Sequence, residues 1–556
     1  MKTICSCFLS GILSLANTLP WQGQNTATQA KNGQQTPPQS GPPSQDPKQP
    51  IAFGLDETNW RTHVLGGIKA SESRQYDKAK DEFEAAIAGW DKTWSDDTHT
   101  AYVFEQMAVI LCHQARYVEV DSMLQRSHEM YFRLFQSVGP TAVVQETVGI
   151  LLSLGFQTEA DNLVKLSQRQ EANLLFLPSL KEELQCLGKA ADAGGRFSQF
   201  FMGSLLEDGF GSVKQDLGLA FQWYWKAASQ GYAPAQEELG RLYDDGRGTK
   251  QDYAEALKWY LESAGQGYAP AQNRVGRMYD FGRGVKQDYA EAFNWYLKAA
   301  EKGLPGAEAN VAYLYETGEG VRQDYVEAIR WYQKAAKVGN AVAQNNLGWI
   351  YKEGLGVPQD YVQALKLFEQ AADKGNGDAE SGLGHMYAHG EGVEQDFVEA
   401  RKWYLKAAEQ HVAVAQNDLG YMYLHGQGGP QDFRKAFDWY KAAADQGFAR
   451  AKYNLGTMYA LGQGVARDDR AAVHWLLAAA EGGDTTACNW LGGMFEDGRG
   501  VPKDDVQAYY WDLLAADSWA DARSRVERLQ EQLTLQQVSD AQRRAREWRA
   551  QHPFAF

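Results

Sequence analysis

The 556-residue chain contains little cysteine, and its cysteines are not spaced as a network of crosslinks. Beyond the first 16 residues only Cys112, Cys186 and Cys488 remain, far apart in sequence and odd in number. Small domains held together by disulfides carry an even number of cysteines at short spacings. The sequence therefore predicts no disulfide framework.

Long apolar runs and an excess of basic charge are also missing. After the first residues, no stretch approaches the roughly 20 apolar residues that a membrane-spanning helix needs. Acidic residues outnumber basic ones by 71 to 55, which gives a net charge of −16. Because nucleic-acid binding requires basic surfaces, we expect no nucleic-acid partner. The lack of a long apolar run predicts no stable transmembrane segment in the mature chain. A basic protein partner is compatible with this charge, although acidity mainly favours solubility.

Arrangements of residues that carry catalysis are absent as well. No Ser/His/Asp or Cys/His combination rises above chance, and turns such as Gly282–Gly284 lack the Lys-Ser/Thr of a phosphate loop. His385 and His389 lie four residues apart, and His425 occupies the position of His389 one repeat later, a spacing that can hold a transition metal. No acidic residue completes a zinc motif, so we interpret them as surface histidines. We expect no enzyme activity, no cofactor and no obligatory metal.

What the sequence does contain is a repeat of 36 residues. The pair Leu239-Gly240 recurs, with small variations, as Val275-Gly276, Val311-Ala312, Leu347-Gly348, Leu383-Gly384, Leu419-Gly420, Leu455-Gly456 and Leu491-Gly492. A fixed period of this size indicates stacked units that cannot fold alone. Such arrays expose a long curved face that can hold another molecule.

Each unit has the pattern of two helices joined by a turn, as residues 271–306 illustrate. Apolar and small residues at helical spacing are followed by the Gly282–Gly284 turn. Asp288 then precedes Glu291 by three residues, which predicts a capping box at the start of the second helix. Gly303 is placed to end that helix.

The second helix of most units carries a Trp-Tyr pair on its apolar side. Trp295-Tyr296 and Trp403-Tyr404 are examples. We expect Trp295 and Trp403 to be buried between helices, where large aromatic side chains supply much of the buried area.

The repeated pattern A-x-x-x-L-G-x-x-Y-x-x-G-x-G-V-x-x-D-x-x-x-A-x-x-W-Y-x-x-A-A-x-x-G resembles the Sel-1-like repeat, a relative of the tetratricopeptide repeat. About nine units cover residues 198–522. The resemblance implies an all-α fold, a right-handed α-solenoid of helix-turn-helix repeats, that binds proteins or peptides. One branch of the family, with reported β-lactam binding, bridges each repeat with a cysteine pair, and this chain lacks those pairs.

Other segments have their own character. Residues 74–90, 115–131 and 155–171 align at spacings of 40–41 and resemble the tetratricopeptide units of kinesin light chain. Thr534 is the expected N-cap of the last helix. The predicted organisation is a signal peptide at 1–16, a disordered linker at 17–54, tetratricopeptide-like units at 55–175, a degenerate half-repeat at 176–197, the repeat array at 198–522 and capping helices at 523–556.

The first 16 residues favour export to the periplasm, cell envelope or outside. Lys2 is followed by an apolar run and then by small residues at Ser14 and Ala16, as in a cleavable secretory signal. A cytoplasmic location is the alternative if the segment is not cleaved.

By resemblance to tetratricopeptide proteins, the first helix of each unit lines the concave face. The residue after the Leu-Gly pair and the one two before its Leu should point to that face. Asn amides can clamp a peptide backbone, and exposed Tyr and Trp often dominate binding energy. The candidate groove contains Asn273, Arg277, Tyr313, Asn345, Trp349, His385, Asn417 and Tyr421. The alternative is that the Asn side chains cap or solvate helices and the aromatics pack between units.

The preferred function is a non-enzymatic scaffold or adaptor that binds a protein or peptide in this groove. A secreted enzyme acting on the cell wall or on a β-lactam is the alternative from another class. The missing cysteine pairs and catalytic cluster favour the scaffold.

Overall fold

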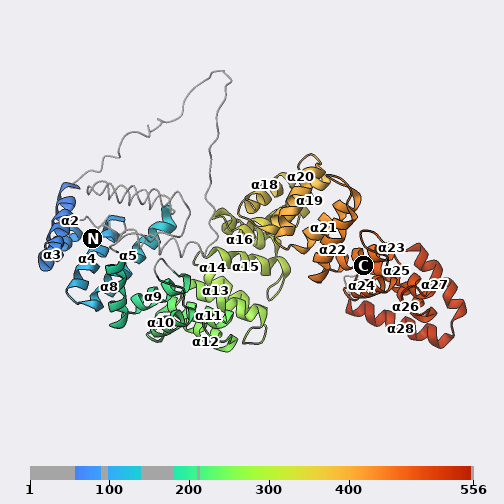
Figure 1. The fold of residues 1–556 in the computed structure, drawn as a ribbon, viewed down its shortest axis with the longest axis horizontal. Helices are drawn as coiled ribbons and strands as arrows, with labels where there is room; N and C mark the ends of the chain where they lie inside the picture. The colour runs from blue at the N-terminus through green and yellow to red at the C-terminus, as the bar shows by residue number, and fades with distance from the viewer. Residues whose placement is uncertain (1–56, 89–97, 139–179, 210–212, 553–556) are drawn as a thin grey trace, which may run out of the picture. The chain divides into compact units, whose positions relative to one another are not determined.

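The computed structural model describes residues 57–88, 98–138, 180–209 and 213–552, and every regular element among them is a helix (Figure 1). The fold is thus all-α, built of consecutive helix pairs as in an α-solenoid. The proposed signal peptide, the proposed linker and the aligned segment 155–171 lie outside the described residues.

The chain divides into two compact units, one of residues 1–314 and 319–322 and one of residues 315–318 and 323–556. The described N-terminal helices belong to the first unit. They are α2 (Glu57–Glu72), α3 (Tyr76–Ala88), α4 (Thr98–His113), α5 (Tyr117–Val138) and α8 (Leu180–Asp192). Within it, α2 packs on α3 and α4 packs on α5.

The repeats follow as alternating first and second helices. The first helices are α9 (Arg196–Asp208), α11 (Ala233–Asp245), α13 (Ala269–Phe281), α15 (Pro305–Thr317), α17 (Ala341–Glu353), α19 (Gly377–His389), α21 (Ala413–His425), α23 (Ala449–Leu461) and α25 (Thr485–Asp497). The second helices are α10 (Leu217–Ser229), α12 (Tyr253–Gly265), α14 (Tyr289–Ala300), α16 (Tyr325–Lys337), α18 (Tyr361–Ala372), α20 (Phe397–Glu409), α22 (Phe433–Asp445), α24 (Asp469–Glu481) and α26 (Asp505–Ala515). The array ends in α27 (Ala520–Gln532) and α28 (Leu535–Gln551).

Side-chain caps start the second helices, as the sequence predicts. Asp288 Oδ1 accepts hydrogen bonds from the backbone N–H groups of Ala290 and Glu291, both at 3.0 Å. The expected return bond from the Glu291 side chain is absent, so α14 has half of a capping box. A complete box occurs at α28, where Thr534 and Gln537 bond reciprocally and confirm Thr534 as the N-cap.

The glycine turn between the helices also sets the packing of neighbouring repeats. Gly282 and Gly284 have φ of 64° and 67°, the left-handed region that a side chain disfavours. A β-carbon on Gly284 would also overlap the backbone carbonyl of Tyr253, at the start of the second helix one repeat earlier. The turn of each repeat therefore rests on its predecessor, and only glycine fits there.

In α14 and α20, tyrosine and not tryptophan fills the core between the paired helices. Tyr296 and Tyr404 are almost fully buried, whereas Trp295 and Trp403 are only half-buried, so the expectation for the tryptophans is wrong. A helix turns about 100° per residue, so the tryptophan points away from the direction of the tyrosine and lies at the edge of the core. One repeat later the equivalent Trp331 is buried beside Tyr332, with 5% of its surface exposed. The tyrosine faces the small Gly276 of the first helix, where a β-carbon would overlap the Tyr296 ring.

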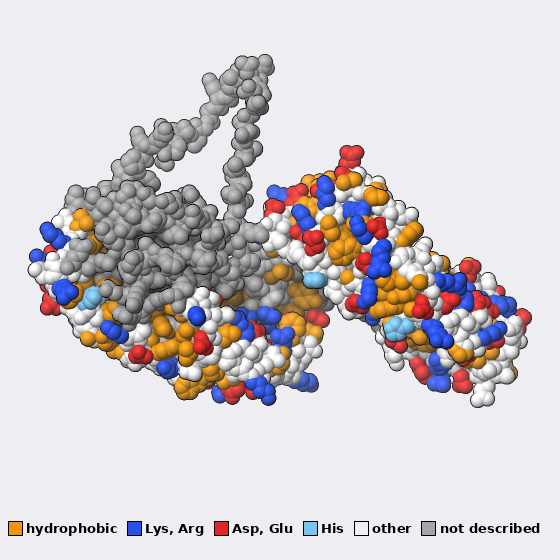
Figure 2. Space-filling model, in the orientation of Figure 1, with side chains coloured by type: hydrophobic (Ala, Val, Ile, Leu, Met, Phe, Trp, Pro, Cys, Tyr) orange, Lys and Arg blue, Asp and Glu red, His pale blue; other side chains and the backbone are white. Residues whose placement is uncertain are grey.

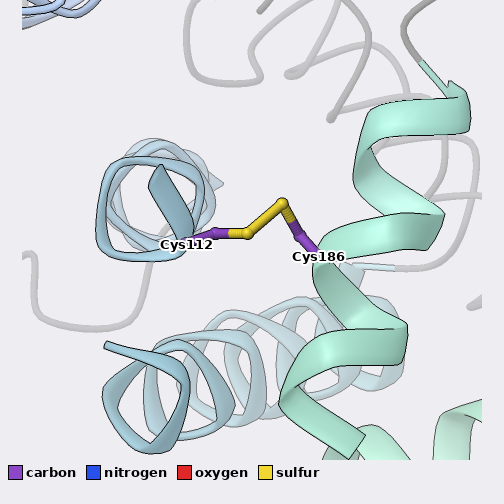
Figure 3. Close-up of a disulfide and its surroundings, with 2 residues drawn as sticks. All are labelled: Cys112 and Cys186. Atoms are coloured by element: carbon purple, nitrogen blue, oxygen red, sulfur yellow. A yellow bond between two sulfur atoms is a disulfide. The ribbon is translucent and has the colours of Figure 1, made fainter. Parts of the chain in front are cut away.

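A disulfide joins α4 to α8 near the start of the array, contrary to the cysteine prediction (Figure 3). Cys112 and Cys186 are 74 residues apart, but helix packing brings their Cα atoms to 5.8 Å. Sequence distance was the wrong guide, because a disulfide requires only that folding bring the two Cα atoms close. Cys488 is free and buried.

A second contact strengthens the same junction. Asp121 on α5 accepts a 2.7 Å hydrogen bond from the backbone N–H of Ser198 at the start of α9. The N-cap residue of α9 is Gly195, which has no side chain to do this. A residue distant in sequence therefore caps the first helix of the array.

Candidate functional site

Buried tyrosines hold the first helices in place through acids on those helices. Tyr296 donates a 2.9 Å hydrogen bond to Asp280, and Tyr332 donates a 2.7 Å bond to Glu316. Burial raises the pKa of Asp280 and of Glu316 above their ordinary values, although the tyrosine bonds oppose this. These acids are used inside the repeats and are unsuited to bind a partner.

The asparagines of the candidate groove form bonds between successive repeats. Asn273 Oδ1 accepts from Asn310 Nδ2 at 3.0 Å, and Asn417 Oδ1 accepts from Asn454 Nδ2 at 2.9 Å. Each donor lies 37 residues after its acceptor. We call this set of positions, two before the Leu of each Leu-Gly pair, the amide column.

A charged pair takes the same positions at the start of the array, and an arginine bonds to the last asparagine of the column at its end. Arg274 Nε on α13 donates to Glu237 on α11 at 2.9 Å. At the end of the array Arg525, from the capping helix α27, donates to Asn489 Oδ1 at 2.7 Å. At Glu237, Asn273, Asn417 and Asn489 the amide column therefore links one helix pair to the next element. Sequence reasoning missed this role, although the 37-residue spacing could have revealed part of it.

Burial separates the candidate asparagines from the candidate aromatic residues. Asn345 and Asn417 are only 6% and 8% exposed, and Asn273 is half-buried. An amide that is buried and bonded within the fold cannot clamp a peptide backbone without rearrangement. In the first compact unit, Arg277 is exposed and the side chain of Tyr313 is 46% exposed.

Aromatic and imidazole rings lie along the first helices of the second unit. Trp349 on α17, His385 on α19 and Tyr421 on α21 occupy the same position of successive repeats, and we call them the ring row. Tyr421 is 47% exposed, whereas Trp349 and His385 are half-buried. The ring centroids of Trp349 and His385 are 6.4 Å apart. Helix α17 contacts α19, and α19 contacts α21, so the ring row lies on three neighbouring helices.

Two more histidines extend the ring row by one helical turn. His389 stacks on His385 with ring centroids 4.1 Å apart, and His425 lies 4.2 Å from the Tyr421 ring. Burial lowers the pKa of His385, with the positive charge of Lys352 acting in the same direction. His385 is therefore favoured in its neutral, ring-stacked form.

An ion-pair cluster occupies the corresponding positions of the first repeats. Arg241 Nη2 contacts both carboxylate oxygens of Glu207 at 2.5 and 2.6 Å, and its Nε donates to Glu238 at 2.6 Å. Burial, followed by repulsion from Glu237, raises the pKa of Glu238 to about 7. These side chains satisfy one another, which leaves the ring row of the second compact unit, with its exposed Tyr421, as the stronger candidate surface.

Charge marks no second candidate among the coloured residues of the face in view. Figure 2 shows acidic and basic side chains interspersed over the repeats on the face in view. Among the described residues, no His, Cys, Asp and Glu side chains gather in a group that could hold a metal. No helix in the described part is both long and apolar enough to cross a membrane.

Comparison with known proteins shows which family the repeats match. A family model described as Sel1 repeat matches nine consecutive segments, the first at residues 197–232 and the last at residues 485–518. No curated protein sequence matches the chain.

Two solved structures illustrate the likeness. One is c5321, a protective antigen of uropathogenic Escherichia coli strains with an SLR fold, which is 27% identical. That match covers 86% of this chain and 96% of c5321, with a TM-score of 0.55. The other is a Sel1 repeat protein from Oxalobacter formigenes, 34% identical over 44% of this chain and 96% of its own, with a TM-score of 0.40.

Proposed function

Because the chain belongs to the Sel1 repeat family, whose repeats imply a protein–protein interaction scaffold, we propose that its first helices hold a segment of a partner protein. The binding surface is the ring row of Trp349, His385 and Tyr421, on the concave face by analogy with tetratricopeptide proteins. No catalytic step is part of this proposal.

The observation that carries the proposal is the exposure of Tyr421 beside other rings at the same position of successive repeats. Large aromatic side chains that remain half in solvent on a rigid surface are typical anchors of protein interfaces. The neighbouring amide column is occupied within the fold, so rings and not amides would provide the contacts. This narrows the candidate groove to its aromatic members.

The test places a photo-crosslinking residue, p-benzoylphenylalanine, at position 421 in the producing cells. The matched control places it at Val362, which is 69% exposed on the second helix α18. We expect a specific crosslinked partner from position 421 and not from position 362. Crosslinks from position 362 alone would move the binding surface to the second helices.

The partner identified in this way allows a measurement of affinity. Tyr421→Ala should weaken binding by about 2 kcal/mol or more if Tyr421 is an anchor. Thermal melting should hardly change, because the side chain is half exposed. Calorimetry with unchanged affinity for this variant would contradict the role of the ring row.

We also propose that the protein is exported. Disulfides form and persist in oxidising compartments, and the Cys112–Cys186 bond supports such a location. Fractionation combined with N-terminal sequencing tests this. A mature chain that begins after Ala16 in an exported fraction is expected, whereas an intact Met1 in the cytoplasm would refute export.

A further inference from the structure

One repeat departs from the others at two positions. Five residues after its N-cap Asp, each other second helix carries an apolar residue, as α18 does at Leu365, but in α20 this residue is Arg401. The residue after the second turn glycine is valine in most repeats, as at Val393, but in the repeat that follows Arg401 it is Gly429. A comparison of the repeats, rather than the overall pattern of charge, therefore singles out this junction.

The two departures fit each other in space. A β-carbon on Gly429 would overlap Nη1 of Arg401, so a valine there would displace the guanidinium. The same guanidinium lies over the ring of Tyr423 on α21, with Cζ 3.7 Å from the ring centroid. Stacking on the ring and contact with the turn therefore fix the position of the Arg401 guanidinium.

The N–H groups of Arg401 are free to bind a ligand. Among the described residues, Arg401 makes no ion pair and no side-chain hydrogen bond. Its nitrogens are not enclosed, because none of them is a buried atom without a partner. Glu399, two residues earlier on α20, is already paired with Lys402 at 2.7 Å. Arg401 therefore presents unused donors to the solvent from a fixed position.

A second cation lies at the same ring. Lys435 Nζ, on α22, is 5.3 Å from the centroid of the Tyr423 ring. Its ion-pair partner Asp432 is 3.9 Å away, and that carboxylate also accepts the backbone N–H of Lys435 at 3.0 Å as the N-cap of α22. One carboxylate cannot neutralise two cations, so positive charge remains at this junction.

We propose that Arg401 binds an oxyanion group of a ligand, a phosphate or a carboxylate, with Lys435 adding positive charge. A guanidinium presents its N–H groups as a planar fork that matches two oxygens of such a group. Fixing the fork before binding lowers the entropy cost of association. The other repeats pack with an apolar residue at this position, so the solenoid does not require an arginine here.

The net charge of the chain opposes an anion only at long range. Physiological salt screens exposed charges beyond about 8 Å, so the total of −16 acts weakly at the junction. Arg401 is half-buried, and its contact with a bound anion is screened less. This site goes beyond the proposed function, and neither result for it alters the expectation for the ring row.

The test follows inorganic phosphate by phosphorus NMR as the full chain is added at constant ionic strength, with chloride as the balancing anion. We expect saturable broadening of the phosphate resonance. Acetate is then added as a competitor. Displacement by acetate supports a carboxylate as the natural ligand group, and broadening that persists supports a phosphate. A phosphate resonance that the wild-type chain does not broaden would overturn the proposal.

A double variant separates binding from folding. Arg401→Leu combined with Gly429→Val gives this junction the residues that the preceding repeat has at Leu365 and Val393. The melting temperature should equal or exceed that of the wild type, because apolar packing replaces a half-buried cation without an ion pair. The affinity for phosphate should fall about tenfold or more, which corresponds to about 1.4 kcal/mol. An affinity equal to that of the wild type would refute the site.

Two further variants complete the test. Arg330→Leu removes an arginine of α16 that is paired with Glu327 at 2.7 Å, and as the matched control it should keep the affinity for phosphate. Arg401→Gln removes the charge and the fork without adding volume, and it should lose the affinity as the double variant does. Full affinity in Arg401→Gln contradicts the inference even if the double variant does not fold.

Discussion

Two adjacent aromatic side chains on the second helix α14 differ in what they contribute. The Tyr296 ring is buried and its hydroxyl bonds to Asp280, whereas Trp295 covers the core edge with Lys298 Nζ 3.8 Å from its ring centroid. The tyrosine both fills space and satisfies a buried acid. The tryptophan keeps one side in contact with water and a cation.

This difference predicts unequal effects of truncation. Tyr296→Ala should reduce the free energy of unfolding by about 3–5 kcal/mol, as for other buried aromatic residues. Trp295→Ala should reduce it by about 1–2 kcal/mol, because less apolar area leaves water when Trp295 folds. Urea unfolding of both variants checks the order, and a larger loss for Trp295 would contradict this assignment of the core.

Asp512 provides a pH-dependent contribution at the end of the array. Burial raises its pKa to about 6, although Arg525 bonds to the carboxylate and opposes the shift. In the unfolded chain, the Asp512 carboxyl loses its proton at about pH 4. Between these values the folded chain holds a proton that the unfolded chain has lost.

The contribution of the Asp512 proton to the free energy of unfolding is fully present below about pH 4 and is lost as the pH rises through about 6. Asp512→Asn should remove this part of the pH dependence. The measurement is the difference in urea unfolding free energy between the wild type and the variant from acid to neutral pH. A difference that does not vary with pH would show that Asp512 does not titrate in this range.

At the scale of elements, one side chain holds the capping helix α27 on the last repeat. Arg525 bonds to Asp512 on α26 and to Asn489 on α25, and Asp512 is fully buried. Arg525→Ala should therefore destabilise the end of the array by about 3–5 kcal/mol, because it leaves a buried carboxylate unpaired.

The matched control is Arg543→Ala on α28, where the arginine pairs with exposed Asp540 and Glu547. An exposed pair of this kind contributes about 0–1 kcal/mol. Equal melting temperatures for the Arg525→Ala and Arg543→Ala variants would show that Arg525 does not anchor the capping helix.

Elements encoded by neighbouring residues could be predicted from the sequence. The caps Asp288 and Thr534 and the turn at Gly282 depend on residues within one or two helical turns, so local patterns were sufficient. The ring row followed from the 36-residue period. The burial of Asn345 and Asn417 could not be predicted in this way, because it depends on contacts with the next repeat. The Cys112–Cys186 pair depends on how α4 and α8 pack, which the sequence does not state.

At the scale of the whole molecule, each repeat contacts mainly its neighbours, so perturbations should remain local. The disulfide closes a loop with a sequence separation of 74 residues. Replacing Cys112 and Cys186 by serine should destabilise that region by about 4 kcal/mol on the loop-entropy estimate.

Hydrogen exchange followed by mass spectrometry can locate the loss. Amides of α4, α5 and α8 should exchange faster in the double variant, whereas those of α21 to α24 should not change. Faster exchange throughout the array would mean that the repeats unfold as one cooperative body.

The glycine turn that rests on the preceding repeat also bears on how such a gene can change in length. Gly284 fits the backbone at Tyr253, and Gly428 fits that at Phe397 in the same way. The backbone contact at these two junctions is therefore the same, although the side-chain contacts differ. An unequal crossover that removes or duplicates 36 codons between equivalent positions rebuilds a native junction at the splice. Length variation among natural alleles should accordingly occur in whole repeats, with the disulfide-linked start and the Arg525-anchored end retained.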